Sequence, residues 1–275
     1  MRRYAAPALS AREFRATLAY VLPALAAADA ITLGGLNRVR VRHKPDGSEV
    51  TAADHAAERL LRRQIRAASP GDAIVGEEFG GALVGSGRCW TIDPIDGTAS
   101  YALGLPVYGT LLALLLDGTP VFGCISIPGL AELTFAATGH GCWLHKSGRR
   151  ARRVHVARPR SLDQAQVSLT SFKETDLIRP AGPWRLAALA RHAGRMRFVG
   201  DCLQYALVCR GALDAALDPL MHPWDIAPLV TCVREAGGAV GDLSGGTGDL
   251  VHSRSFVAAS SDGLRRAICR FTRSR

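Results

Sequence analysis

Helix-like and strand-like hydrophobic patterns alternate along the whole chain. Apolar residues recur with helical spacing within 54–68 and 225–236, which predicts two amphipathic helices, and a further helix is expected at 184–192. Residues 38–44 alternate like a strand, and short apolar runs typical of buried strands occupy 73–75, 89–92, 107–116, 121–127, 134–137, 141–144, 165–169 and 197–199. This alternation predicts the α/β fold class.

The N-terminal region combines basic residues with an apolar run at 18–28, which faintly resembles a signal peptide. Glu13, Arg15 and Pro23 interrupt that pattern, and Ser10 with Glu13 fits a capping box that opens an amphipathic helix. We therefore expect a helix here. No stretch reaches the ~20 apolar residues that span a bilayer, so we expect a cytoplasmic protein with no membrane partner.

The chain has 275 residues and shows no linker, internal repeat or low-complexity segment between its halves. We therefore expect one domain over residues 1–275. Seven cysteines are scattered among apolar neighbours without a Cys-x-x-Cys pair. Their pattern predicts buried free thiols in a reducing cytoplasm and does not fit a zinc site.

Two carboxylates follow the apolar run that ends at Ile92. Asp93 and Asp96 lie three positions apart around Pro94, which removes a backbone donor and is expected to end the strand. If the two carboxylates converge, a cation or a proton must lie between them, and hard oxygen ligands suit Mg²⁺. The following Gly97-Thr98 is typical of a turn into a helix whose free amides can hold a phosphate. The alternative is that both aspartates only cap turns.

Further acidic residues lie at two other places, the end of an expected strand and the start of an expected helix. Glu77 and Glu78 follow the strand-like run 73–75, and Asp225 opens the helix at 225–236. For Asp225 the alternative is a helix cap, since a carboxylate is favourable at a helix N-terminus. Loops gather at the strand ends of α/β sheets, so carboxylates that are distant in the sequence can come together there in one site.

These motifs together resemble one protein family. The motifs are Gly76-Glu77-Glu78, Trp90-x-x-Asp93-Pro94-Ile95-Asp96-Gly97-Thr98 and Trp224-Asp225-Ile226-Ala227 with Glu235-Ala236-Gly237-Gly238. In order and spacing they are similar to those of the inositol monophosphatase family, over roughly residues 10 to 265. The resemblance implies a layered αβαβα sandwich, related to the fructose-1,6-bisphosphatase fold, a homodimer, and phosphate-ester hydrolysis that depends on two or three Mg²⁺ ions per site.

The resemblance also implies roles for individual residues. Glu77, Asp93, the Ile95 carbonyl, Asp96 and Asp225 would hold the metals, with Asp93 bridging them. Thr98 and Glu77 would position the attacking water, and no phosphoenzyme would form. The Gly97 and Thr98 amides would receive the phosphate. By the pattern Lys-Pro-Asp-Gly-x-x-Val-Thr-x-x-Asp, Lys44 would lie near metal or phosphate, and Asp54 would support Thr98 or hold a third metal.

The expected substrate depends on a shorter motif. Gly200-Asp201-Cys202 stands where inositol-specific members show Gly-Ser-Ala, and this version resembles bacterial histidinol-phosphate phosphatases. An added carboxylate at Asp201 would suit a cationic alcohol such as histidinol. Ser100 and Tyr101 point the same way, whereas Ala99 departs from the Arg or Lys of that pattern. Inositol 1-phosphate, another sugar-alcohol phosphate or a nucleotide phosphate remains the alternative.

The charge balance suggests a rival function. The formal charge is +10, and arginines gather at Arg149, Arg150, Arg152, Arg153, Arg158 and Arg160. Such a basic segment raises the possibility of a nucleic-acid-binding protein. These arginines lack interleaved aromatic residues and a docking module, so we expect no nucleic-acid partner. A positive field would instead steer anionic phosphate esters toward the protein.

Overall fold

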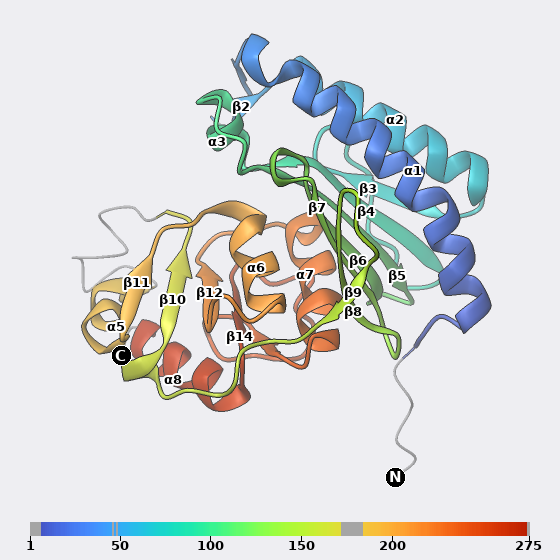
Figure 1. Cartoon of the computed structure of the whole chain (residues 1–275). Coiled ribbons are helices and arrows are strands. Elements are labelled where there is room, and N and C mark those ends of the chain that lie inside the picture. The colour runs from blue at the N-terminus through green and yellow to red at the C-terminus, as the bar shows by residue number, and fades with distance from the viewer. Residues whose placement is uncertain (1–6, 46, 48, 172–183, 274–275) are drawn as a thin grey trace.

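The computed structural model describes residues 7–45, 47, 49–171 and 184–273. Two large β-sheets and three helical layers alternate in the order αβαβα (Figure 1), and β1 and β2 form a separate two-stranded sheet. Helices α1 (Ala11–Gly35) and α2 (Ala52–Ala68) form the first layer. Helices α6 (Asp201–Cys209) and α7 (Pro223–Glu235) lie between the sheets, and α5 (Leu186–His192) and α8 (Asp262–Thr272) form the last layer. The predicted layered α/β sandwich is confirmed.

The first sheet has seven strands in sequential order. Strands β3 and β4 pair in parallel, and every later neighbour pairs antiparallel. The strands are β3 (Ala73–Gly76), β4 (Arg88–Asp96), β5 (Gly109–Leu116), β6 (Thr119–Ile127), β7 (Glu132–Ala137), β8 (Gly141–Lys146) and β9 (Arg152–Val154). The expected hairpin at Asp117-Gly118 joins β5 to β6.

The second sheet has five strands in the order β11-β10-β12-β14-β13. They are β10 (Gln166–Leu169), β11 (Arg195–Arg197), β12 (Ala215–Asp218), β13 (Ala239–Gly241) and β14 (Phe256–Ala259). Shorter elements complete the described chain: η1 (Leu36–Arg38), β1 (Arg42–His43), β2 (Glu49–Val50), α3 (Thr98–Ala102), η2 (Pro128–Leu130) and η3 (Leu162–Gln164).

Helix α1 begins at the expected capping box, in which Ser10 and Glu13 bond reciprocally. By length and composition it is apolar enough to cross a membrane, with a mean hydropathy of 1.6. The prediction from the sequence, that no stretch is long and apolar enough to span a bilayer, differs from this finding. One face of the helix nevertheless lies in the core, where Val21, Leu25 and Ala28 pack with residues of α2 and the first sheet. A buried stripe along one face is typical of an amphipathic helix that packs on a hydrophobic core.

A second hydrophobic core fills the space between the two sheets. Helices α6 and α7 contribute residues such as Tyr205, Leu229 and Val233, which pack on Leu111 and Phe256 from opposite sheets. All seven cysteines are buried free thiols, as the sequence predicts. This packing fixes the first turns of α6 and α7 beside the end of β4, where the acidic residues lie.

Three local expectations are wrong. Strand β4 continues through Pro94 to Asp96, because a register shift between Asp93 and Asp96 takes the proline out of regular pairing, and Thr110 Oγ1 donates to the Pro94 carbonyl at 2.9 Å. The alternating segment 38–44 forms only the two-residue strand β1, whose side chains are exposed. Strand β11 lies two positions earlier than the expected 197–199.

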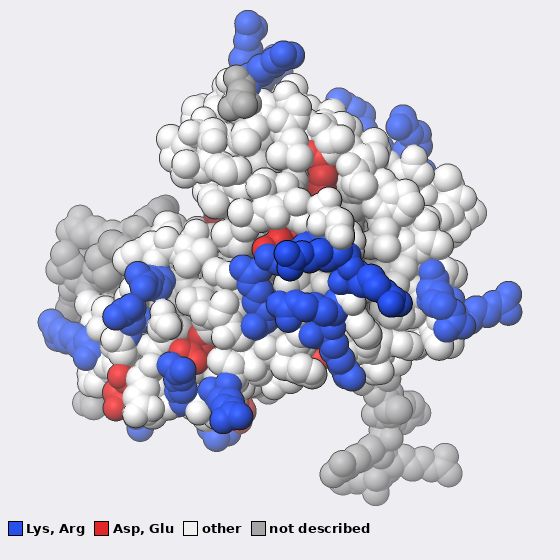
Figure 2. Space-filling view, in the orientation of Figure 1, with Lys and Arg blue, Asp and Glu red and all other residues white. Residues whose placement is uncertain are grey.

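The basic residues gather on part of the surface. Figure 2 shows Lys and Arg side chains across the middle of one face, where Figure 1 places β8 and β9. The arginines singled out in the sequence, Arg149, Arg150, Arg152, Arg153, Arg158 and Arg160, are all exposed.

Candidate functional site

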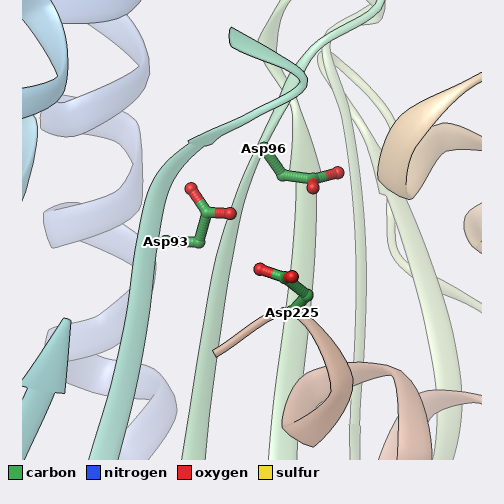
Figure 3. Close-up of side chains that lie close together, drawn as sticks. All are labelled: Asp93, Asp96 and Asp225. Atoms are coloured by element: carbon green, nitrogen blue, oxygen red, sulfur yellow. The ribbon is translucent and has the colours of Figure 1, made fainter. Parts of the chain in front are cut away.

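Three aspartates from two elements meet between the sheets. Asp93 and Asp96 lie at the end of β4, and Asp225 lies in the first turn of α7. Each offers one carboxylate oxygen, and these oxygens lie within 4.8 Å of one another (Figure 3). The convergence that the sequence predicted for the strand-end carboxylates is therefore present.

Each aspartate is held by a backbone amide. Asp93 Oδ1 accepts a hydrogen bond from the Ile95 amide at 3.0 Å, Asp96 Oδ2 accepts one from the Cys202 amide at 2.5 Å, and Asp225 Oδ2 accepts one from the His222 amide at 2.7 Å. Asp225 thus caps α7, as the alternative reading proposed, and also belongs to the acidic group. One residue can do both, because a carboxylate oxygen that accepts one hydrogen bond leaves further lone pairs on the group for other partners.

Burial and mutual repulsion make this group a strong attractor for cations. Desolvation raises the pKa of Asp93 well above its usual value, and the charges of Glu77, Asp96 and Asp225 raise it further. Desolvation also raises the pKa of Asp225 to about 7. Carboxylates that share a site in this way are stabilised by a bound divalent ion, and an all-oxygen donor set fits Mg²⁺.

The two glutamates of the loop after β3 share one cation. Lys44 Nζ donates to Glu77 Oε1 at 2.7 Å and to Glu78 Oε1 at 2.8 Å. These hydrogen bonds outweigh the effect of burial and raise the pKa of the Lys44 ammonium. The sequence placed Lys44 near metal or phosphate, and the structure places it on the glutamates beside the aspartate group.

A buried glutamate on α2 supports this loop. Glu58 is fully buried, and its carboxylate accepts hydrogen bonds from the Glu78 and Phe79 amides at 2.7 and 3.3 Å. Arg62 donates to the same carboxylate at 2.6 Å and so balances its charge. A Cβ at Gly76 would lie 2.0 Å from Glu58 Oε1, so the close approach requires glycine.

The turn after β4 leads into a short helix, as the sequence predicts. Gly97 has a φ of +88° and precedes α3, of which Thr98 is the first residue. Thr98 Oγ1 donates to the Ile95 carbonyl at 3.0 Å, so the oxygen expected to ligate a metal faces the threonine hydroxyl. Backbone amides at such a turn are free to bind an anion.

Asp54 is bound to its own helix start. It is buried, and its Oδ2 accepts hydrogen bonds from the Thr51 amide at 2.8 Å and the Thr51 hydroxyl at 2.5 Å. Its Oδ1 is buried without a partner. Within the described part of the chain no hydrogen bond joins Asp54 to Thr98. The free oxygen of Asp54 is the atom available to a further ligand.

A cavity of about 210 Å³ opens beside the aspartate group. Asp96 and Asp225 line one part of it, and Thr170, Asp201 and Asp218 line another. Desolvation raises the pKa of Asp201, and it raises the pKa of Asp218 to about 7. Four carboxylates around one small cavity create an environment that favours a cation.

The match to a family model decides what this chain is. The model described as the inositol monophosphatase family matches residues 17–274. The chain belongs to the inositol monophosphatase family. Membership confirms the predicted family and the predicted class of enzyme, a phosphomonoester hydrolase.

Individual relatives narrow the comparison within the inositol monophosphatase family. The chain is 40% identical to the histidinol-phosphatase of Mycobacterium tuberculosis over 230 residues, which cover 84% of this chain and 86% of that protein. It is 36% identical to the inositol-1-monophosphatase ImpA of Mycolicibacterium smegmatis over 214 residues, which cover 76% of this chain and 75% of that protein. The solved structure of a Thermotoga maritima IMPase matches with a TM-score of 0.81 and 28% identity, over 93% of this chain and 96% of that one.

Two groups in this inositol monophosphatase fold were missed by the sequence reading. Asp218 ends the buried strand β12, so the strand-end rule that singled out Asp93 would have found it. Glu58 and Arg62 lie one helical turn apart within α2, where an amphipathic pattern assigns charged residues to solvent. Only the buried contacts of these two side chains reveal their place under the glutamate loop.

Proposed function

We propose that the protein is a Mg²⁺-dependent phosphatase that hydrolyses histidinol phosphate. The observation that carries this proposal is the cavity beside the aspartate group, which Asp201 and Asp218 line. Histidinol carries an ammonium group. A cavity that has carboxylates in its wall and opens beside the expected phosphate site complements such an alcohol. The 40% identity to a histidinol-phosphatase supports the same choice.

The donor set favours Mg²⁺ as the cofactor. Glu77, Asp93, Asp96, Asp225 and the Ile95 carbonyl supply only oxygen ligands, and the three converging aspartates repel one another when no cation is bound. When bound, Mg²⁺ ions supply charge neutralisation for the phosphate and lower the pKa of a coordinated water. We expect two or three ions, with Asp54 as the ligand of the third through its unpartnered Oδ1.

The remaining steps belong to the chain itself. The Gly97 and Thr98 amides receive the phosphate oxygens at the start of α3. Thr98 and Glu77 orient the attacking water, and Lys44 holds Glu77 in place. Phosphoryl transfer depends mainly on such positioning and on charge. In the proposed step the positioned water attacks phosphorus in line and the alcohol leaves, so that no phosphoenzyme is needed.

Inositol 1-phosphate is the second candidate substrate. A carboxylate at Asp201 can also accept hydrogen bonds from hydroxyl groups, and the chain is 36% identical to an inositol-1-monophosphatase. For either substrate we propose a cytoplasmic homodimer whose positive surface steers phosphate esters and which has no nucleic-acid or membrane partner.

Phosphate release from L-histidinol phosphate and from inositol 1-phosphate, measured side by side, tests the proposal. We expect release from histidinol phosphate at least tenfold faster at equal concentration, dependent on Mg²⁺ and abolished by EDTA and by Asp93→Asn. Faster release from inositol 1-phosphate would make that ester the proposed substrate and would leave the proposed Mg²⁺ dependence in place. Release that persists in EDTA would overturn the metal chemistry as well.

A further inference from the structure

Four arginines of α2 surround an exposed aromatic ring behind the glutamate loop. Arg59, Arg62, Arg63 and Arg66 line a cavity of about 440 Å³ together with Phe79. Their spacing of three and four positions places all four on one face of the helix. We propose that this arginine pocket binds a di- or triphosphate group, either free or carried on a nucleotide.

The charge of the arginine pocket is not balanced by neighbouring residues. Arg62 alone is paired, through Glu58. Within the described ranges, Arg59, Arg63 and Arg66 form no ion pair with a carboxylate, and all three are exposed. Like charges at these spacings repel one another, so a multivalent anion that contacts several guanidinium groups relieves repulsion as well as gaining charge-assisted hydrogen bonds.

The pocket is also partly ordered in advance. The Arg59 guanidinium lies 5.5 Å from the centroid of the Phe79 ring, and the Arg62 guanidinium lies 6.0 Å from it. Contacts between guanidinium groups and an aromatic ring restrict long side chains that would otherwise sample many rotamers. A di- or triphosphate is favoured over a single carboxylate here, because its several charged oxygens can contact several guanidinium groups at once.

The pocket connects to the glutamate loop, residues 77–80, through buried contacts. Arg62 donates to Glu58 and to the Gly80 carbonyl, and Glu58 accepts from the Glu78 and Phe79 amides. An anion that fixes Arg62 and Phe79 therefore also fixes the loop that presents Glu77. We infer that occupancy of the arginine pocket reduces the opening of this loop. This site goes beyond the proposed catalytic function and does not depend on it.

Isothermal titration calorimetry of the full-length protein with inorganic tripolyphosphate and with ATP tests the pocket. EDTA keeps the aspartate group free of metal, so that this group repels anions. The test variant is Arg63→Gln/Arg66→Gln, which leaves the buried Arg62 intact. The matched control is Arg149→Gln/Arg150→Gln, which removes two other exposed arginines and lowers the formal charge of +10 by the same two units.

We expect tripolyphosphate binding to weaken at least tenfold in the test variant and less than threefold in the control. Tighter binding of ATP than of tripolyphosphate would identify a nucleotide as the source, and equal binding a free anion. Equal weakening in both variants, or no binding to the wild type, would overturn the site. Hydrogen exchange reports the coupling: amides at 77–80 should exchange more slowly with bound anion, and unchanged exchange would refute the link to the loop.

Discussion

Ser100 Oγ donates a hydrogen bond to Asp201 Oδ2 at 2.7 Å, which joins the turn after β4 to the start of α6. Asp201 also packs against Gly97, because a Cβ on that glycine would lie 2.4 Å from Asp201 Oδ2. The residue proposed to select the alcohol therefore touches the turn proposed to hold the phosphate. Substrate choice and phosphate placement depend on the same contact.

The first prediction concerns Asp201→Asn. Asp201 has a φ of +48°, a conformation that asparagine also tolerates, so the variant should fold and keep the bond from Ser100. Loss of the negative charge should lower kcat/KM for histidinol phosphate by about 30-fold, because a partly buried charge pair contributes roughly 2 kcal/mol or more. For inositol 1-phosphate, kcat/KM should change less than threefold. An equal loss for both substrates would remove Asp201 as the selecting residue.

The second prediction concerns Gly97→Ala. At this position the new Cβ meets Asp201 and the φ of +88° is strained for alanine, so the turn must shift. We expect kcat to fall at least 100-fold. Gly104→Ala is the matched control, because Gly104 has a φ of +74° but no atom within 4 Å of the new Cβ. The control should lose stability without losing kcat, and a similar fall in kcat in both variants would show that backbone strain alone is responsible.

The third prediction concerns repulsion within the aspartate group. In EDTA, Asp225→Asn should raise the Tm by about 2–4 °C, since removing one of the converging carboxylates relieves roughly 1 kcal/mol of repulsion. The side-chain oxygen of asparagine can still accept the hydrogen bond from the His222 amide, so the start of α7 is preserved. Added Mg²⁺ should stabilise the wild type more than the variant, which lacks one of the proposed ligands. Differential scanning calorimetry with and without Mg²⁺ measures both effects.

Asp163→Asn supplies the control for that experiment, because Asp163 is exposed and lies far from the group in sequence. Its response to Mg²⁺ should match that of the wild type. If Asp225→Asn instead lowered the Tm in EDTA, the capping role of Asp225 would outweigh the repulsion, and the case for a cation at this point would weaken.

The sequence predicted the parts of the site that follow from strand ends and helix starts. Asp93, Asp96 and Asp225 stood out as carboxylates at the ends of elements, where each could also have been only a cap. The combined motifs, through their resemblance to one family, decided between these alternatives and implied the layered fold. Contacts between distant segments were out of reach. Nothing near Gly97 in the chain indicates that Asp201 packs against it, since that contact depends on how α6 docks between the sheets.

The sequence also misjudged charged residues inside patterned segments. An amphipathic pattern assumes that charge faces water, yet Glu58 and Arg62 are buried because each neutralises the other beneath the glutamate loop. Alternation failed at 38–44 for the opposite reason, because β1 is exposed and has no core to face. Prediction from hydrophobic periodicity therefore fails where an ion pair allows charged side chains to be buried, and where an alternating segment has no core to pack against.

The fourth prediction concerns Asp29 on α1. Desolvation raises the pKa of Asp29 from 3.8 to about 6, although Ser126 Oγ donates to its Oδ2 at 2.7 Å, and Oδ1 is buried without a partner. A carboxyl whose pKa is raised by folding stabilises the fold below its unfolded pKa and loses that contribution as the pH rises through the folded pKa. Stability should therefore fall between about pH 4 and pH 6 from this group alone.

Asp29→Asn removes that titration and keeps an acceptor for Ser126. Because Asp29 retains some solvent contact, water offsets part of the cost of its charge, and the variant should gain about 1–2 kcal/mol in unfolding free energy at pH 7.5. At pH 4, where the wild-type carboxyl is largely protonated, the two proteins should differ by less than about 0.5 kcal/mol. Urea unfolding at both pH values measures this. A gain of the same size at both would show that ionisation of Asp29 is not its cause.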